Sequence, residues 1–302
     1  MLLGVVAAGL IGGGTWLWTP DRSRSALEAK YLARPDDYVE VAGMRLHVRD
    51  RGPRDAPAVL MVHGIGSSLH TWEPWAQMLA ADFRVVGFDL PGAGLTGADP
   101  TGDYSDTRCL QVVVALLDKL GIARASVIGN SIGGRIAWKL AAQHADRVDK
   151  LVLIAPDGFE SEGFKYGKQT RLPPMFRLMR YALPKRILRM MLASAYGNAA
   201  FLSDEQVARY HDLMLAPGVR DASIARLEQT RLEPPEPWLR QISAPTLLLW
   251  GAKDVIIPMA NAADYRKSLP QSELVVFPEL GHVPHEEAPA LSVAPIREFL
   301  AR

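Results

Sequence analysis

The sequence contains very little cysteine and no marked excess of charge of either sign. Cys109 is the only cysteine in 302 residues, so no disulfide can form within the chain. Lysine and arginine number 34 against 33 aspartate and glutamate residues, which gives no reason to expect nucleic acid as a partner. Internal repeats and low-complexity tracts are absent from the sequence, and an apolar content of 48% is enough for a large core. These features argue against disorder and favour a globular protein.

The first eighteen residues, MLLGVVAAGLIGGGTWLW, contain no charge. This run is slightly shorter than the roughly 20 residues of a typical membrane span, and it lacks the basic start and small-residue cleavage site of a secretory signal. We therefore expect residues 1–20 to hold an uncleaved membrane anchor, with Trp16 and Trp18 at the interface. The alternative is a signal segment of a secreted or periplasmic protein. The sequence leaves the side of the membrane open.

Short apolar runs alternate with helical patterns through most of the remaining chain. Residues 38–52 alternate around Ala42 and Gly43, as in a two-stranded hairpin. Continuous apolar runs then recur, each typical of a strand buried on both faces. This alternation predicts a mostly parallel α/β sheet with helices on both faces and the hairpin at one edge. The predicted strands are 56–64, 83–92, 125–130, 150–156, 244–251 and 272–278, and the predicted helices are 71–81, 106–120, 132–144 and 288–300.

The alternation fails between Pro156 and Pro245. This interval is too long for an ordinary connection and carries helical patterns of its own, which predicts an inserted helical cap at 157–243. The core then consists of residues 21–156 and 244–302. Within the cap, residues 164–191 carry eight basic residues interleaved with apolar ones and no acidic residue. Such a segment is either a membrane-surface element or a solvated basic face over an apolar face that lines a pocket.

A serine lies between two glycines where a predicted buried strand stops and a helical pattern begins. Gly129, Ser131 and Gly133 form a G-x-S-x-G sequence at this point. A lone match of this kind arises by chance, but here the small residues allow a sharp turn that lifts the hydroxyl above the carboxyl edge of the sheet. The helix that follows aims its first amides at the same point, which favours developing negative charge. The placement predicts a nucleophile.

A serine hydroxyl needs a base and an orienting carboxylate to act as a nucleophile. Asp254 and His282 each follow one of the last two predicted strands, so both lie at the edge where Ser131 is expected. The chain order Ser, Asp, His is that of the nucleophile-elbow enzymes. We therefore predict that His282 is the base and Asp254 the acid. The backbone amides of Ile65 and Ile132 are the predicted oxyanion donors.

Other side chains compete for these roles. Asp157 follows the predicted strand 150–156 and is a substitute for the acid. His285 lies three residues past His282, but it falls at the start of the last predicted helix and is expected to point elsewhere. His63 ends the predicted strand 56–64, and we expect it to be structural.

Two patterns resemble ligand sites without the required context. Gly92, Gly94 and Gly97 form a G-x-G-x-x-G sequence after a strand, but no helical pattern opens there, which favours a tight loop over a dinucleotide site. Residues 282–287 contain two histidines and two glutamates. Pro284 breaks the helical spacing that paired ligands use, so we expect no metal site.

From about residue 38 to the end, the chain resembles the alpha/beta-hydrolase superfamily. HGIGSS is similar to its oxyanion loop, GNSIGG to its elbow and GHVPHEEAP to its histidine loop, with DLPGAGLTG as the loop after the intervening strand. The resemblance implies an eight-stranded sheet with a helical cap after the sixth strand, serine hydrolase activity and no cofactor. Haloalkane dehalogenases and epoxide hydrolases resemble this architecture but use an aspartate where Ser131 stands.

The elbow also resembles that of meta-cleavage product hydrolases, which split carbon-carbon bonds. Those enzymes usually carry Trp straight after the catalytic histidine, where Val283 stands here. We therefore expect a membrane-associated hydrolase of small-molecule carboxylic esters, with contact through residues 1–18 and the basic cap. The apolar, methionine-rich cap favours hydrophobic acyl or aromatic substrates. The alternatives are a carbon-carbon hydrolase, a cofactor-free perhydrolase, and a binding protein that kept the fold without turnover.

Overall fold

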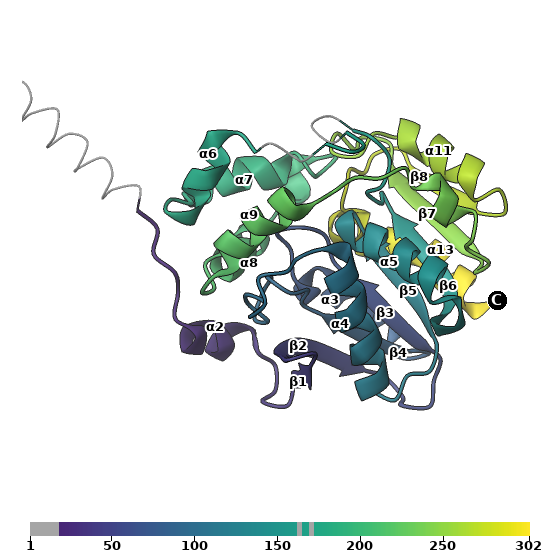
Figure 1. Ribbon diagram of the computed structural model, residues 1–302, viewed down its shortest axis with the longest axis horizontal. Helices are drawn as coiled ribbons and strands as arrows, with labels where there is room; N and C mark the ends of the chain where they lie inside the picture. The colour runs from purple at the N-terminus through teal and green to yellow at the C-terminus, as the bar shows by residue number, and fades with distance from the viewer. Residues whose placement is uncertain (1–17, 162–164, 169–171) are drawn as a thin grey trace, which may run out of the picture.

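The computed structural model describes residues 18–161, 165–168 and 172–302, whose strands form one eight-stranded sheet (Figure 1). The strand order is β1-β2-β4-β3-β5-β6-β7-β8. Strand β2 pairs antiparallel with β1 and β4, and all other neighbours are parallel. The predicted parallel sheet with a hairpin at one edge is thus confirmed. The strands are β1 Tyr38–Val41, β2 Met44–Arg51, β3 Ala58–Val62, β4 Arg84–Phe88, β5 Ala125–Asn130, β6 Val148–Ile154, β7 Thr246–Gly251 and β8 Glu273–Phe277.

Helices cover both faces of this sheet. One buried cluster joins the sheet to α4, α5 and α11, and a second joins the opposite face to α3 and α13. The neighbours Val127 and Ile128 of β5 belong to different clusters, which explains why a strand buried on both faces has no polar alternation. The helices of the core are α2 Arg24–Tyr31, η1 Leu69–Trp72, α3 Glu73–Leu79, α4 Asp106–Lys119, α5 Ile132–Gln143, η2 Ala145–Arg147, α11 Ala260–Ser268, α12 Pro284–Glu287 and α13 Pro289–Ala301.

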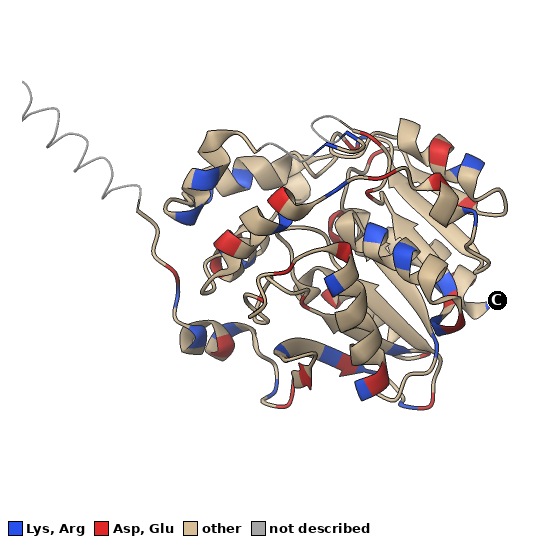
Figure 2. Ribbon diagram, in the orientation of Figure 1, with Lys and Arg blue, Asp and Glu red and all other residues tan. Residues whose placement is uncertain are grey.

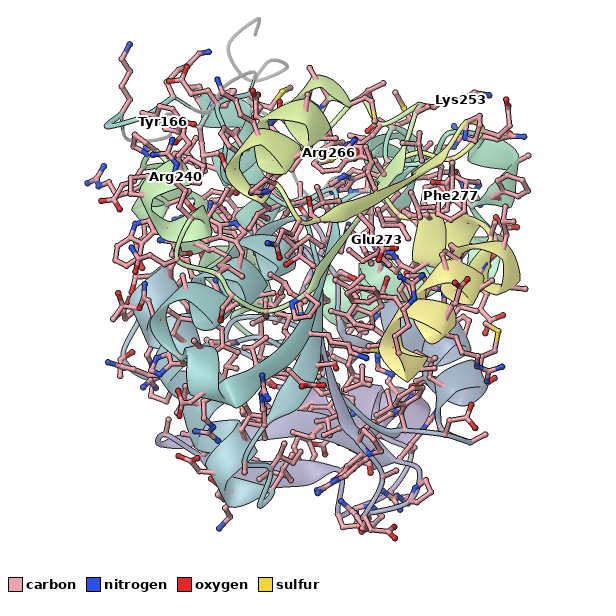
Figure 3. The ribbon with its side chains drawn as sticks, turned by 90° about the vertical axis from the view of Figure 1, so that its right-hand side faces the viewer. Tyr166, Arg240, Lys253, Arg266, Glu273 and Phe277 are labelled. Atoms are coloured by element: carbon pink, nitrogen blue, oxygen red, sulfur yellow. The ribbon has the colours of Figure 1, made fainter. Side chains whose placement is uncertain are left out.

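The carboxyl ends of the parallel strands meet at one edge of the sheet, where the loops of the site begin. Figure 3 views the molecule from the side of β8, which begins at Glu273 and ends at Phe277. Lys253 follows β7 at the same edge as Phe277, and its N–H donates to the carbonyl of Leu280. The loops after β7 and β8 are therefore neighbours, as the predicted site requires.

The loop after β4 is a tight turn. Gly92, Gly94 and Gly97 all have positive φ, and a Cβ at Gly94 would lie 2.1 Å from the carboxylate of Asp89. No helix begins between β4 and the start of α4. At that start the Ser105 hydroxyl accepts a hydrogen bond from the Arg108 N–H. The glycine pattern therefore serves the turn, as expected.

The chain between β6 and β7 is helical in its described part and carries the predicted cap (Figure 1). Leu188 of α7 and Leu213 of α8 share a buried cluster with Leu27 of α2, so the cap rests partly on the helix that precedes the sheet. The helices of this segment are α6 Pro174–Arg177, η3 Leu178–Arg180, α7 Lys185–Ala193, η4 Ala199–Phe201, α8 Asp204–Met214, α9 Val219–Gln229 and α10 Glu236–Leu239.

The predicted anchor at residues 1–20 lies outside the described residues except for its last three. Among the residues that the structure does describe, no helix has both the length and the apolar character needed to cross a bilayer. The membrane anchor therefore stays a prediction.

Candidate active site

The turn between β5 and α5 places Ser131 in a strained backbone conformation, with φ at 57°. A non-glycine residue rarely adopts such a φ, and where it does the strain often serves a function. The flanking glycines allow the turn, because a Cβ at Gly129 would lie 2.3 Å from the carbonyl oxygen of Gly133, and one at Gly133 would lie 2.2 Å from that of Val62. The G-x-S-x-G spacing is therefore required by close backbone approach.

The predicted acid and base are in direct contact. His282 Nδ1 lies 2.7 Å from Asp254 Oδ2, and both side chains are buried. The other carboxylate oxygen of Asp254 accepts hydrogen bonds from the N–H groups of Ile256 and Ile257. The carboxylate is thus held by its own loop and fixes the imidazole with Nδ1 as the proton donor, which leaves Nε2 free to act as a base.

Asn130 brings the histidine loop to the serine. Its side-chain amide donates to the carbonyl oxygens of His282, at 3.0 Å, and Ile154, at 3.1 Å. Ser131 is the next residue, so the main chain of the histidine abuts the elbow. Within the described residues, no hydrogen bond joins the Ser131 hydroxyl to the His282 imidazole. Such contacts are often long in substrate-free enzymes and shorten when substrate binds.

The backbone N–H groups of Ile65 and Ile132 have no protein acceptor in the described chain. Ile132 is the first residue of α5, where the helix leaves its N–H groups unpaired. Gly64 lies against the elbow, since a Cβ there would be 3.2 Å from Ser131 Cβ. The amide of Ile65 is the next one along the chain from this contact. Both are the amides that the sequence indicated as oxyanion donors.

His63 fixes this loop. Its Nδ1 lies 2.7 Å from the carbonyl oxygen of Gly64, and its Nε2 accepts a hydrogen bond from the N–H of Leu90. Burial lowers the pKa of His63, so the ring stays neutral and keeps both bonds. The histidine has a structural position at the strand end, as expected.

The competing acid and the second histidine have other partners. Asp157 forms an ion pair with the buried Arg135. Burial acts to lower the pKa of Arg135, but Asp157 and Asp106 outweigh this effect and raise the pKa overall. His285 lies against Trp72 with ring centroids 4.3 Å apart. Neither side chain replaces Asp254 or His282 at the site.

Glu286 connects the cap to the core. Its carboxylate accepts hydrogen bonds from the hydroxyls of Thr71, Tyr196 and Tyr210, and Arg209 Nη2 lies 3.0 Å away. Thr71 belongs to the core, whereas the other three belong to the cap. No sequence pattern indicates this network, because its members are joined only by the fold.

Glu287 holds the histidine loop against the cap. Its carboxylate accepts from the N–H groups of Gly281 and Gly197. Burial raises the pKa of Glu287, and these backbone bonds oppose that rise. Of the two histidines and two glutamates in residues 282–287, His282 contacts Asp254 and Glu287 contacts backbone N–H groups, whereas His285 and Glu286 both contact Thr71.

The cap backbone lies directly over the histidine. The His282 N–H donates to the carbonyl of Ala195 at 2.7 Å, and a Cβ at Gly281 would meet the N of Gly197 at 2.5 Å. Val283 packs with cap residues, Tyr196 among them. The position taken by Trp in meta-cleavage product hydrolases therefore faces the cap.

Comparison with known proteins places this chain in a family. A model of the alpha/beta hydrolase fold matches residues 57–289, which is more than half of the chain. The chain therefore belongs to the alpha/beta hydrolase family and is a hydrolase. It is 28% identical over 250 residues to 2-hydroxy-6-oxo-6-phenylhexa-2,4-dienoate hydrolase of Burkholderia cepacia. The aligned region covers 80% of this chain and 86% of that relative.

Solved structures share the fold. A meta-cleavage product hydrolase from Pseudomonas fluorescens IP01 superposes with a TM-score of 0.75 at 22% identity, over 87% of this chain and 97% of that one. A membrane phospholipase A, described as a bacterial virulence factor, gives a TM-score of 0.71 at 25% identity, over 99% and 97%. The second match extends over almost the entire chain.

Proposed function

We propose that this hydrolase cleaves carboxylic esters of hydrophobic substrates, with Ser131 as nucleophile, His282 as base and Asp254 as acid. The observation that carries the proposal is the contact between Asp254 and His282, at 2.7 Å. Asn130 holds the loop of His282 beside the strained Ser131. Ser131 is buried, with 7% of its surface exposed. A serine in this setting suits acyl transfer, because it lies at the carboxyl end of a strand, where a positioned imidazole can remove its proton.

In this mechanism the Ser131 hydroxyl attacks the ester carbonyl while His282 Nε2 takes its proton. The N–H groups of Ile65 and Ile132 hold the oxyanion of the tetrahedral intermediate. Collapse expels the alcohol, which receives the proton from His282, and leaves the acyl group on the serine. Water then loses a proton to His282 and attacks the acyl carbon, which releases the acid and restores the hydroxyl. Asp254 stabilises the imidazolium formed in both halves.

The site also favours apolar acyl groups. Ile65 at the oxyanion loop is partly exposed, and a Cβ at Gly66 would contact the sulfur of Met214 on cap helix α8. The likeness to a membrane phospholipase A over almost the whole chain supports a lipid-like ester. By contrast, Met175 and Met190 are 73% and 74% exposed, which favours the membrane-surface alternative for these two methionines.

Substitution of the serine tests the proposal. Ser131→Ala removes only the hydroxyl, and we expect turnover of a p-nitrophenyl ester to fall by about 10³-fold or more. A fluorophosphonate probe, which reacts with activated serines, should label the parent and not the variant. A parent that resists the probe and an alanine variant within tenfold of the parent rate would exclude Ser131 as nucleophile. It would also favour a binding protein without turnover.

Carbon-carbon hydrolysis is the second candidate, because the Burkholderia relative is a dienoate hydrolase. Val283 in place of Trp speaks against it, as does the phospholipase likeness. Ester and vinylogous diketone substrates compared on the same preparation separate the two. A higher kcat/KM for the diketone than for every ester in a chain-length series would select the carbon-carbon reaction.

The apolar start of the chain supports membrane attachment of this hydrolase through residues 1–18. The fractionation of full-length protein tests it. We expect the protein to sediment with membranes, with the N-terminal segment intact by mass spectrometry. Recovery of uncleaved chain in the soluble fraction would exclude the anchor, and recovery of a shortened chain would select a signal segment.

A further inference from the structure

Helix α7 has a buried apolar side and an exposed apolar side. Leu188 is buried in the cap, and Leu192 packs beside it. Ile187, Met190 and Met191 are exposed and lie at i, i+3 and i+4, so they share one face that nothing in the described chain covers. An exposed apolar face of this kind marks a surface that contacts something else.

The apolar surface continues along the chain before α7. Met175 of α6 and Leu178 and Tyr181 beside it are each more than half exposed. We call these residues, with Ile187, Met190 and Met191, the outer cap face. It lies at the end of the molecule where α6 and α7 are seen in Figure 1, and the other cap helices α8 and α9 lie between it and the sheet.

Basic side chains border the outer cap face. From residue 163 to 203 the sequence contains no acidic residue, and Figure 2 shows basic but no acidic positions on α6 and α7. Arg177, Arg180 and Arg189 pair with acidic residues of α8 and α9. Lys185 and Arg186 are exposed and have no ion-pair partner among the described residues. An apolar stripe on a helix whose first turn carries two free cations, Lys185 and Arg186, is typical of an interfacial helix on an anionic bilayer.

The start of the described chain joins this same face. Trp18 stacks on Tyr181 with ring centroids 6.0 Å apart, and the N–H of Thr19 donates to the carbonyl of Tyr181 at 2.9 Å. The hydroxyl of Thr19 accepts from the N–H of Leu183. The described chain therefore begins beside the outer cap face, at a half-exposed tryptophan. Tryptophan and tyrosine favour the membrane interface.

We propose that the outer cap face lies in the surface of a membrane that contains anionic lipids, with Lys185 and Arg186 at the headgroups and Met190 among the acyl chains. The proposal rests on the proposed function for its consequence, namely that an ester substrate reaches the cap from the bilayer. The contact itself is measured without turnover, so the two can fail independently.

A dye at position 190 of the full-length chain tests the contact. Cys109 is completely buried, so Met190→Cys gives a single accessible thiol for an environment-sensitive fluorophore. On vesicles of phosphatidylcholine and phosphatidylglycerol we expect a blue shift and quenching by brominated acyl chains. Leu291→Cys on α13 is the matched control, because Leu291 is also apolar and 59% exposed but lies far along the chain. The dye at 291 should stay in water.

Charge reversal tests the lipid preference. Each cation near an anionic surface contributes about a fivefold gain in binding. Lys185→Glu with Arg186→Glu removes two cations and adds two anions, so this face should lose at least about thirtyfold of its binding. Arg266→Glu with Lys267→Glu, an exposed basic pair on α11, should lose little. The circular dichroism spectrum should be unchanged in all of these variants, which shows that they are folded whether or not the protein hydrolyses esters.

Three results would overturn the proposal. A chain that sediments with vesicles while the dye at 190 stays in water would mean that the anchor alone makes contact. A blue shift at 190 that grows with protein concentration in the absence of vesicles would mean that a second copy covers the face. Equal loss of binding in the α7 and α11 charge variants would mean that net charge, not this face, attracts the membrane.

Discussion

The carboxyl edge of the sheet and the outer cap face differ in how many of their hydrogen-bonding and packing contacts the chain itself supplies. At the sheet edge, the carboxylates of Asp254 and Glu286 each have several donors, and the glycines around Ser131 allow one tight backbone arrangement. On the outer cap face, Met190 and its apolar neighbours lie open. Buried polar groups are costly when unpaired, so a complete network indicates that the region is formed before any ligand arrives.

This difference separates preorganisation from docking. A catalytic edge must hold its groups in place before the substrate binds, since positioning lowers the barrier. A docking face gains its stabilising contacts only when the partner arrives. Substitutions at the sheet edge are therefore expected to change turnover or folding in solution, whereas those on the outer cap face change only what happens on a bilayer.

The largest expected effect distinguishes two acids at neighbouring strand ends. Asp254→Asn removes the acceptor that fixes the His282 tautomer, and we expect kcat to fall about 10⁴-fold with unchanged stability. Asp157→Asn should instead lower stability, because the buried Arg135 keeps only Asp106 as a charged partner. Steady-state kinetics and urea unfolding of both variants provide the measurement. A greater loss of kcat in the Asp157 variant would assign the acid to Asp157.

The second effect concerns the backbone of the elbow. Gly133→Ala places a Cβ about 2.2 Å from the carbonyl oxygen of Val62, and we expect a loss of about 4 kcal/mol or more in the free energy of unfolding. Gly121→Ala is the control for backbone strain without a close contact, because its φ is unfavourable at +65°, unlike that of Gly133, but no atom lies near its Cβ. It should cost about 1–2 kcal/mol. Equal losses in the two variants would show that close approach at the elbow contributes nothing.

The third effect concerns the connection between the sheet edge and the cap. Glu286→Gln leaves Arg209 without its carboxylate and weakens the bonds from Thr71, Tyr196 and Tyr210, for a loss of about 2 kcal/mol. Glu279→Gln breaks only an exposed pair with Lys253 and should change stability by less than about 0.5 kcal/mol. Chemical unfolding measures both. If the two variants match, the Glu286 network does not hold the cap.

The strands and core helices could be predicted from the sequence because their signals are local. The predicted strand at 125–130 has the observed bounds of β5, and the predicted helices agree with α3, α4, α5 and α13 to within two residues. The places of Ser131, Asp254 and His282 at one edge followed from strand ends in a parallel sheet. Periodicity located the strand ends, and the G-x-S-x-G motif with the chain order Ser, Asp, His selected these residues.

The cap and the links around the site could not be predicted in the same way. Periodicity gave the cap helix an apolar face but not the direction in which Met190 points, since that depends on how α7 packs on α8. The bond from Asn130 to His282 joins residues 152 positions apart, and that from Tyr196 to Glu286 joins residues 90 apart. Such pairs have no local signature in a single sequence.

The smallest effect is a change in the slope of stability with pH. Burial lowers the pKa of His285 to about 3, whereas an unfolded histidine titrates near about 6.5. As the pH falls below that region, the unfolded chain takes up a proton that the folded chain does not. Stability is therefore complete above about pH 6.5 and falls as the pH decreases toward 3, by up to about 1.4 kcal/mol per unit for each such histidine.

His285→Gln tests this slope, because glutamine can still donate to Thr71 but cannot titrate. Urea unfolding at several pH values between 4 and 7 should give a shallower acid limb for the variant, even if its stability at neutral pH is lower. His70, whose pKa burial also lowers to about 3, maintains the remaining slope. Parallel curves for the variant and the parent would mean that His285 takes up its proton without unfolding, and that the packing against Trp72 at this edge is looser than the structure indicates.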